Sequence, residues 1–275
     1  MRFIDIELAR RVEMAEADAG RTCAEAYHAL HPEVPVAVTE IAGGIAVFAG
    51  VNSPVTQAIG VGLNGDVTDD QLDALGNFFH SRSAAATVEI CPFVPMNLYE
   101  KFAARGYSLL EVILILDDLA RLRVSAAVPR GVMIRPTRAD GSKLWTLTVA
   151  QGFAEHFPVT QAMLDVMEGF CNRGGESCAY LAFINGEAAG DGVVGAHKGV
   201  AGLFGASTLP AFRSRGVQSA LLDARLAWAS AHGCDLAVSL TQPGSISHRN
   251  IERRGFRVAY TRTKLVQPLQ NRYRC

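Results

Sequence analysis

The sequence predicts a mixed α/β fold built from two similar halves. Short apolar stretches alternate with amphipathic stretches along the chain, as strands and helices do in α/β proteins. A pattern of helix, glycine, aromatic residue and strand occurs twice, with Gly106-Tyr107 corresponding to Gly255-Phe256 at an offset of 255 − 106 = 149 residues. The same offset aligns the neighbouring helices and strands without a gap. This regularity predicts a duplicated unit.

The first half is expected to cover residues 1–118. It begins with a long predicted helix over 4–30, which His31-Pro32 end. Another helix is expected to begin at Thr68, because Thr68-Asp69-Asp70-Gln71 resembles a capping box. A third helix is expected over 98–104. Apolar segments predict strands over 34–41, 45–48, 56–63, 86–93 and 107–116.

The second half is expected to cover residues 131–275, after a linker over 119–130. Two helices are predicted between 140 and 170, one from Gly216 to about Gly233, and one over 245–254. Asn185-Gly186 predicts a hairpin turn. Apolar segments predict strands over 132–135, 179–184, 188–197, 199–208, 236–240 and 256–266.

Composition excludes several classes of protein. The chain has 275 residues, of which 49% are hydrophobic and 19% charged, and its net charge is −1. These values are typical of folded domains and give no electrostatic basis for nucleic-acid binding. The N-terminal segment is charged and no apolar run is long enough for a membrane span, so a cytoplasmic protein is expected. Six scattered cysteines predict neither a disulfide framework nor a metal site.

One turn in the second half has the features of an anion site. The predicted strand that ends at Ser207 and Thr208 is followed by Arg213-Ser-Arg-Gly216, and a helix begins at once. The N-terminus of a helix presents unpaired N–H groups and a partial positive charge. Glycine allows close approach of the backbone, and the two arginines add charge-assisted hydrogen bonds. A pyrophosphate is the expected ligand.

The whole order of strand, R-x-x-G turn, helix, strand, short helix, Gly-Phe and strand resembles the acyl-CoA-binding part of the GNAT superfamily of N-acyltransferases. The family turn is commonly Q/R-x-x-G-x-G/A, and here Gln218 replaces the second small residue. The resemblance covers 131–275 and, more loosely, 34–118. It implies two GNAT-like domains in tandem, each a twisted mixed sheet flanked by helices. It also implies acetyl-CoA as co-substrate, with no metal. The implied cofactor-binding residues are Ser207, Thr208, Arg213, Ser214, Arg215, Gly216, Val217, Gln218 and Ser219.

Catalytic groups are harder to assign. The tyrosine acid that the family often carries falls at Ile251, and the strand over 199–208 holds no carboxylate base. Candidates for these roles are His248, Tyr260, Glu155 and His156. Asp191, on a predicted strand, is a further candidate for binding an amine. Acyl transfer from an activated thioester needs little beyond positioning, so activity is still expected.

The first half contains a competing motif. Gly60-Val-Gly62-Leu-Asn-Gly65 fits a dinucleotide-binding pattern, but Asp66, Asp69 and Asp70 follow it. Carboxylates would repel a pyrophosphate, and they are better explained as partners of the helix N-terminus. The first half is therefore predicted to be a degenerate copy without an acyl-CoA site.

The predicted function is transfer of an acetyl group from acetyl-CoA to a primary amine by direct attack. The acceptor is a small-molecule or peptide amine that the sequence does not identify, and neither nucleic acid nor a membrane is an expected partner. A non-catalytic acyl-CoA-binding or scaffolding protein is the alternative. The oligomeric state is left open.

Overall fold

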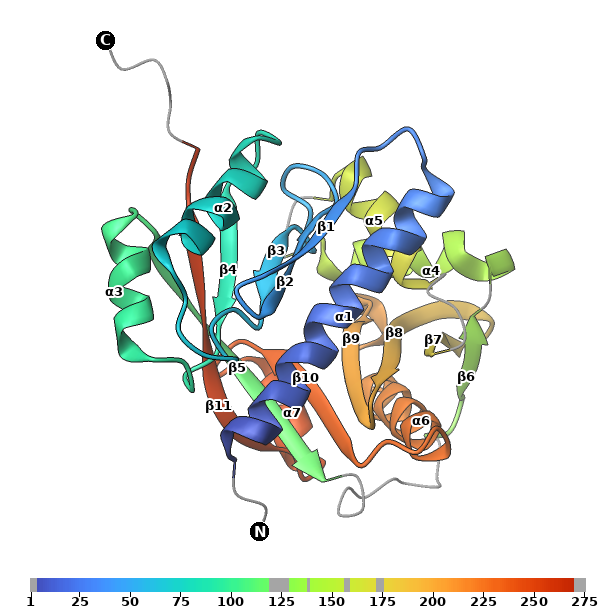
Figure 1. Ribbon diagram of the computed structural model, residues 1–275. Helices are drawn as coiled ribbons and strands as arrows, with labels where there is room; N and C mark the ends of the chain where they lie inside the picture. The colour runs from blue at the N-terminus through green and yellow to red at the C-terminus, as the bar shows by residue number, and fades with distance from the viewer. Residues whose placement is uncertain (1–3, 119–128, 138, 156–158, 172–175, 270–275) are drawn as a thin grey trace.

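The computed structural model describes residues 4–118, 129–137, 139–155, 159–171 and 176–269 (Figure 1). Its helices are α1 (Ile6–Leu30), α2 (Asp69–His80), α3 (Met96–Ala104), α4 (Ser142–Phe153), α5 (Gln161–Cys171), α6 (Val217–Ala231) and α7 (Ile246–Arg253), with short 3₁₀ turns η2 (Ala139–Gly141) and η3 (Pro210–Phe212). Its strands are β1 (Ala37–Ile41), β2 (Gly44–Phe48), β3 (Gln57–Ile59), β4 (Ala86–Ile90), β5 (Ser108–Asp118), β6 (Val132–Thr137), β7 (Ser177–Ile184), β8 (Glu187–His197), β9 (Val200–Thr208), β10 (Leu236–Thr241) and β11 (Arg257–Gln267).

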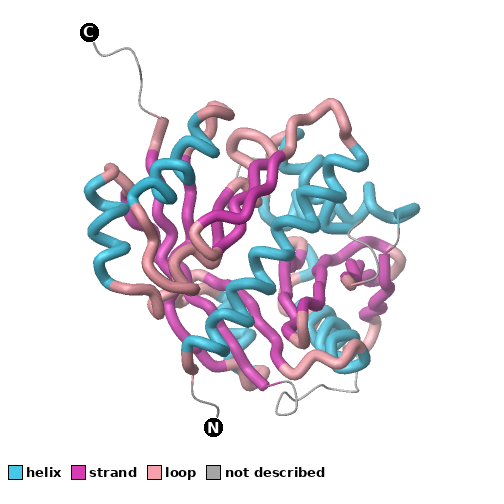
Figure 2. The backbone as a smooth tube through the Cα atoms, viewed as in Figure 1, coloured by secondary structure: helices cyan, strands magenta, loops and turns pink. Residues whose placement is uncertain are grey.

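The strands form one mixed sheet in the order β1-β2-β3-β4-β11-β5-β10-β9-β8-β7-β6. They occupy the middle of the molecule, and the helices lie around them (Figure 2). The predicted mixed α/β class with two similar halves is confirmed, and the two half-sheets join into a single sheet.

The halves exchange their last strands at the centre of this sheet. β11, which ends the second half, pairs antiparallel with β4 of the first half. β5, which ends the first half, pairs antiparallel with both β11 and β10. Each terminal strand therefore lies beside the penultimate strand of the other half. The predicted boundaries at residues 118 and 131 remain predictions, and most of the proposed linker lies outside the described residues.

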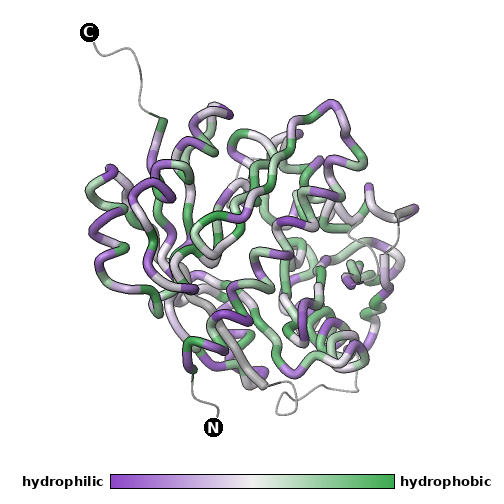
Figure 3. The backbone as a smooth tube through the Cα atoms, in the orientation of Figure 1, coloured by the Kyte–Doolittle hydropathy of each residue, from purple (hydrophilic) through white to green (hydrophobic). Residues whose placement is uncertain are grey.

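The helices cover both faces of the second half of the sheet. Val193 of β8 packs with Trp145 of α4, whereas Val194 packs with Leu222 of α6. Successive strand residues point to opposite faces, so α4 and α6 lie on opposite sides. Helix α1 crosses in front of the sheet and packs against both halves, with hydrophobic and hydrophilic positions interleaved along it (Figures 1 and 3).

Most predicted elements are confirmed, and the largest difference is in the strand expected over 56–63. That strand ends at Ile59, because Gly60 and Gly62 adopt left-handed φ values of +82° and +81°. The Asn185-Gly186 turn has positive φ at both residues, as a type I′ hairpin requires. The capping box at Thr68 is also confirmed, with both of its hydrogen bonds formed. Among the described helices, none is long and apolar enough to cross a membrane.

A buried cluster of charges fixes β11 against the first half. The Arg262 guanidinium is fully buried and donates to Glu13 of α1 at 3.0 Å and to Glu89 of β4 at 2.7 Å. Lys264 adds a contact to Glu89 at 3.2 Å. The Tyr260 hydroxyl donates to Glu13 at 2.6 Å. The exchanged strand is therefore tied to the first half by hydrogen-bonded ion pairs as well as by the sheet.

Candidate functional site

The candidate site begins where β9 separates from β10. These parallel strands pair only from Val200 to Gly202 on β9 and from Leu236 to Val238 on β10. β9 continues along β8 to Thr208, with a bulge where the register shifts between Phe204 and Ser207. Gly205, inside this bulge, has a φ of +44°. Beyond Gly202, the edge of β9 that faced β10 is available for a ligand that pairs like a strand.

The turn after β9 presents backbone N–H groups at the start of α6. Leu209 donates its N–H to the Ala189 carbonyl at 3.0 Å, which holds the end of β9 on β8. Ser214 and Gly216 both adopt left-handed conformations, with φ values of +61° and +82°. Helix α6 then begins at Val217 with no side-chain cap. Such turns form concave groups of N–H donors that bind anions.

The side chains of the turn add positive charge. Arg213, Ser214 and Arg215 are exposed, and the Arg215 guanidinium lies 5.7 Å from the centre of the Phe212 ring. Arg213 donates to the Glu155 carboxylate at 2.5 Å. Glu155 is therefore placed beside the predicted pyrophosphate turn, where it would compete with a phosphate for Arg213.

Gly216 is required by the fold as well as by the proposed ligand. Its φ of +82° disfavours other residues, and an added Cβ would lie 2.6 Å from Cγ of Pro129. A substitution at this position would therefore strain the protein directly. Charge changes at Arg213 and Arg215, which are exposed, test anion binding by the turn without this strain.

Helix α7 supports the turn from the side. The Asn250 amide donates to Oε1 of Gln218 at 2.6 Å, so the Gln218 side chain points toward α7. Arg254 donates to the Ser219 carbonyl at 3.3 Å. The replacement of the second small residue by Gln218 thus leaves the backbone N–H groups at the start of α6 in place.

The three catalytic candidates that the structure describes do not form one group. Nδ1 of His248 accepts the Gly244 N–H at 3.2 Å, and its Nε2 lies 3.6 Å from Glu252, so the imidazole helps to organise the start of α7. Tyr260 is buried beside Glu13 and Phe93 of the first half, and burial raises the pKa of its hydroxyl. Glu155 lies at Arg213, and His156 is outside the described residues. No catalytic role is tested by this geometry, and these assignments stay predictions.

A buried carboxyl lies directly behind the site. Asp191 of β8 is fully buried, and the Ser207 hydroxyl donates to it at 2.5 Å. Burial raises the pKa of Asp191 to about 8, although the Ser207 hydrogen bond and the charge of Arg225 lower it in part. Ser207 is therefore held by β8, while Thr208 keeps a buried hydroxyl oxygen that has no hydrogen-bond partner in the part of the chain that the structure describes.

The corresponding region of the first half differs in both charge and packing. Thr68 caps α2 through the Gln71 N–H, and Asp69 pairs with Arg105. A Cβ at Gly62 would lie 2.5 Å from Cδ2 of Leu98, so this glycine faces the core rather than a ligand. The N-terminus of α2 is thus satisfied internally, whereas that of α6 is not.

The sequence predicts a glycine turn before α6, which the structure contains, but it does not predict several contacts that shape the site. Arg225, the contact of Pro129 with Gly216, and a cavity between the halves were not expected. Arg225 lies in an amphipathic helix, where an arginine is normally expected on the exposed face. Only its position among the apolar residues of that helix indicates that it is buried. Within the described residues, no cluster of three or more His, Cys, Asp or Glu side chains could hold a metal ion.

The comparisons with known proteins agree with this geometry. Residues 144–256 match the family model described as Acetyltransferase (GNAT) family. The match covers most of the second half of the chain, including β9, the turn after it and α7. No curated protein matches the sequence.

Solved structures share the fold of the whole chain. A GCN5-related N-acetyltransferase from Kribbella flavida is 15% identical with a TM-score of 0.66, covering 91% of this chain and 95% of that chain. A tandem GNAT protein from the clavulanic acid biosynthesis pathway is 13% identical with a TM-score of 0.58, covering 90% and 94%. A GCN5-related N-acetyltransferase from Sphaerobacter thermophilus is 13% identical with a TM-score of 0.58, covering 85% and 76%. The chain therefore has a tandem-GNAT fold.

Proposed function

We propose that this protein transfers an acetyl group from acetyl-CoA to a primary amine. The observation that carries the proposal is the continuity between the free edge of β9 and the basic, uncapped start of α6. The pantetheine arm would form strand-like hydrogen bonds along residues 203–208. The pyrophosphate would accept hydrogen bonds from the backbone N–H groups of residues 213–219. The match of residues 144–256 to the GNAT acetyltransferase family model supports the same assignment.

The chemistry requires a neutral amine near the bulge of β9. The amine nitrogen attacks the thioester carbonyl carbon, and backbone N–H groups of β9 stabilise the negative charge that develops on the carbonyl oxygen. The C–S bond then breaks, the amine loses a proton to solvent, and the sulfur gains one. Holding both reactants in place supplies much of the acceleration, because the thioester is already activated.

The first half is proposed to lack an acyl-CoA site of its own. Its capped, acidic α2 and the core-facing Gly62 support this proposal. Titration of CoA by calorimetry should therefore give one site per chain. A stoichiometry of two would contradict the degenerate first half.

A double charge reversal tests the cofactor turn. Arg213→Glu with Arg215→Glu should weaken CoA binding by at least about tenfold, because two charge-assisted contacts become repulsive. Calorimetry measures the affinity, and circular dichroism checks the fold. Arg82→Glu with Arg257→Glu changes the charge equally outside the turn and should leave the affinity unchanged.

Equal CoA affinity in both double variants would contradict the proposal that this turn binds the pyrophosphate. Release of free CoA thiol, measured across a panel of amines, then separates enzyme from binder. Tight CoA binding without thiol release from any amine would favour the non-catalytic alternative.

A further inference from the structure

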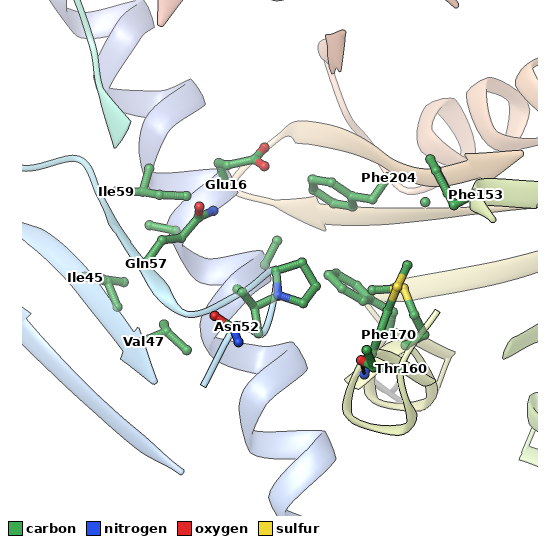
Figure 4. Close-up of a pocket in the computed structure, with 18 residues that line it drawn as sticks. Glu16, Ile45, Val47, Asn52, Gln57, Ile59, Phe153, Thr160, Phe170 and Phe204 are labelled. Carbon is green, nitrogen blue, oxygen red and sulfur yellow. Dashed lines mark hydrogen bonds between the residues drawn. The ribbon is translucent and has the colours of Figure 1, made fainter. Parts of the chain in front are cut away.

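A cavity of about 620 Å³ lies between the two halves of the molecule (Figure 4). The first half contributes residues of α1, β2, β3 and the loop before β3, and the second half contributes residues of α4, α5 and β9. Ile45, Val47 and Ile59 face Phe153, Phe170 and Phe204 across it. The volume suits a small organic molecule.

The cavity reaches the reactive end of the proposed acyl-CoA site. Phe204 and Gly205 belong to its wall and also to the bulge of β9, just beyond the point where β9 leaves β10. A thioester carbonyl that is bound along this edge would face the cavity. A molecule in the cavity could therefore present a nucleophile to that carbonyl.

The chemistry of the walls is mostly apolar. Aliphatic and aromatic side chains are joined by the adaptable thioethers of Met163 and Met167. Among the described residues that line the cavity, Glu16 is the only charged one. Glu16 projects from α1 with its carboxylate on the side of Phe204, and its charge also acts on the buried Arg262 guanidinium (Figure 4). A negative charge beside an apolar cavity favours a cation that is attached to an apolar body.

We infer that this cavity binds the acceptor, and that the acceptor is a primary amine carried on an aliphatic or aromatic body. The inference rests on the proposed acetyl transfer. Glu16 attracts the ammonium form at entry, and the apolar walls select the body. The first half, which is proposed to lack an acyl-CoA site of its own, thereby supplies part of the acceptor pocket and contributes to its specificity.

Amine size and polarity provide the first test. Butylamine, hexylamine and phenethylamine are compared with spermidine and lysine, with acetyl-CoA as donor and CoA thiol as readout. Each added methylene should improve kcat/KM by about fourfold until the cavity is filled, because burying a methylene is worth about that factor in affinity. A preference for spermidine or lysine would overturn the inference and leave acetyl transfer intact.

Filling the cavity provides the second test. A Cβ at Gly20 would approach only Cγ2 of Val47, at 4.0 Å, so Gly20→Leu places a side chain in the cavity without straining the helix. This variant should raise KM for hexylamine by at least about tenfold while CoA affinity is unchanged. Ala29→Leu, at an exposed position of the same helix, should change neither value.

Glu16→Gln tests the charge without changing the shape of the cavity. It should weaken binding of hexylamine, measured by calorimetry in the presence of CoA, and leave binding of the uncharged analogue hexanol unchanged. This direct measurement does not depend on turnover. Absence of hexylamine binding to the native protein would overturn the inference even if CoA binds.

A longer acyl chain is the competing occupant. If the cavity held the donor's chain, octanoyl-CoA would bind more tightly than acetyl-CoA, and Gly20→Leu would remove the difference. That result would also overturn the inference. Equal binding of the two donors, together with the amine preference, would support it.

Discussion

At the scale of single residues, Asp191 shows how the fold tolerates a carboxyl in the sheet. Its side chain is buried between β8 and β9, and Arg225, whose pKa burial lowers to about 10, lies near enough to interact with its charge. For each group, burial destabilises the charged form by more than the opposite charge of the partner stabilises it. The same arrangement holds Ser207 at the edge of the proposed site.

This arrangement predicts a pH-dependent stability. The pKa of Asp191 is about 8 in the folded protein, against 3.8 for an unperturbed aspartate. Between these values the folded chain keeps a proton that the unfolded chain releases, so the free energy of unfolding falls as pH rises, by up to about 1.4 kcal/mol per unit. Asp191→Asn should flatten this slope in urea denaturation between about pH 5 and about pH 8.

Asp140→Asn, at an exposed position, is the matched control and should keep the slope of the native protein. Parallel curves for Asp191→Asn and the native protein would show that the buried carboxyl does not titrate in this range.

At the scale of elements, β11 depends on charges that come from two other elements. Arg262 is enclosed by Glu13 of α1 and Glu89 of β4, and its positive charge opposes the rise that burial causes in the pKa of Glu13. Removing one partner of a buried ion pair leaves an uncompensated charge, which is more costly than replacing the whole cluster by neutral groups.

Arg262→Met is therefore expected to lower the free energy of unfolding by about 3–5 kcal/mol. The triple variant Glu13→Gln, Arg262→Met, Glu89→Gln should lose less than the single variant, because the carboxylates that Arg262 neutralised are replaced as well, while Lys264 keeps its hydrogen bond to Gln57 at 2.8 Å. Urea denaturation measures both. A larger loss in the triple variant would mean that the ion pairs contribute net stability.

The sequence predicted the individual helices and strands better than it predicted how they pair and pack. The offset of 149 residues brings β11 onto β5 and the last residue of α7 onto that of α3. Helix caps, glycine turns and apolar periodicity act within a few residues, so they can be read from the sequence. The exchange of β5 and β11 could not be predicted from the sequence, because the apolar residues of each strand suit pairing with either β4 or β10. The cavity was missed for a related reason, since its walls come from segments as distant as Val47 and Phe204.

At the scale of the whole molecule, the two halves share one sheet and one cavity. β5 lies between β10 and β11, so the second half lacks a central strand without the first. Helix α1 packs against α5 and β9 of the second half as well as β2 and β3 of the first. Separate folding of the second half would leave these surfaces exposed to water.

A fragment of residues 129–275 is accordingly expected to be unfolded or aggregated when it is produced alone. Co-production with a fragment of residues 1–128 should restore a folded complex that binds CoA. Size-exclusion chromatography and circular dichroism distinguish the two states. A monomeric, folded 129–275 fragment with native CoA affinity would contradict this dependence.

The exchanged strands also constrain when the protein can fold during synthesis. β4 is complete once residue 90 has been made, but its neighbour β11 is complete only at Gln267. While the ribosome adds the intervening segment, the edge of β4 that will pair with β11 is still unpaired. Unpaired strand edges are prone to pair with other chains. Domains commonly fold one after another as they emerge. Here the first half must wait for β11, so both halves are completed together once β11 has emerged from the ribosome.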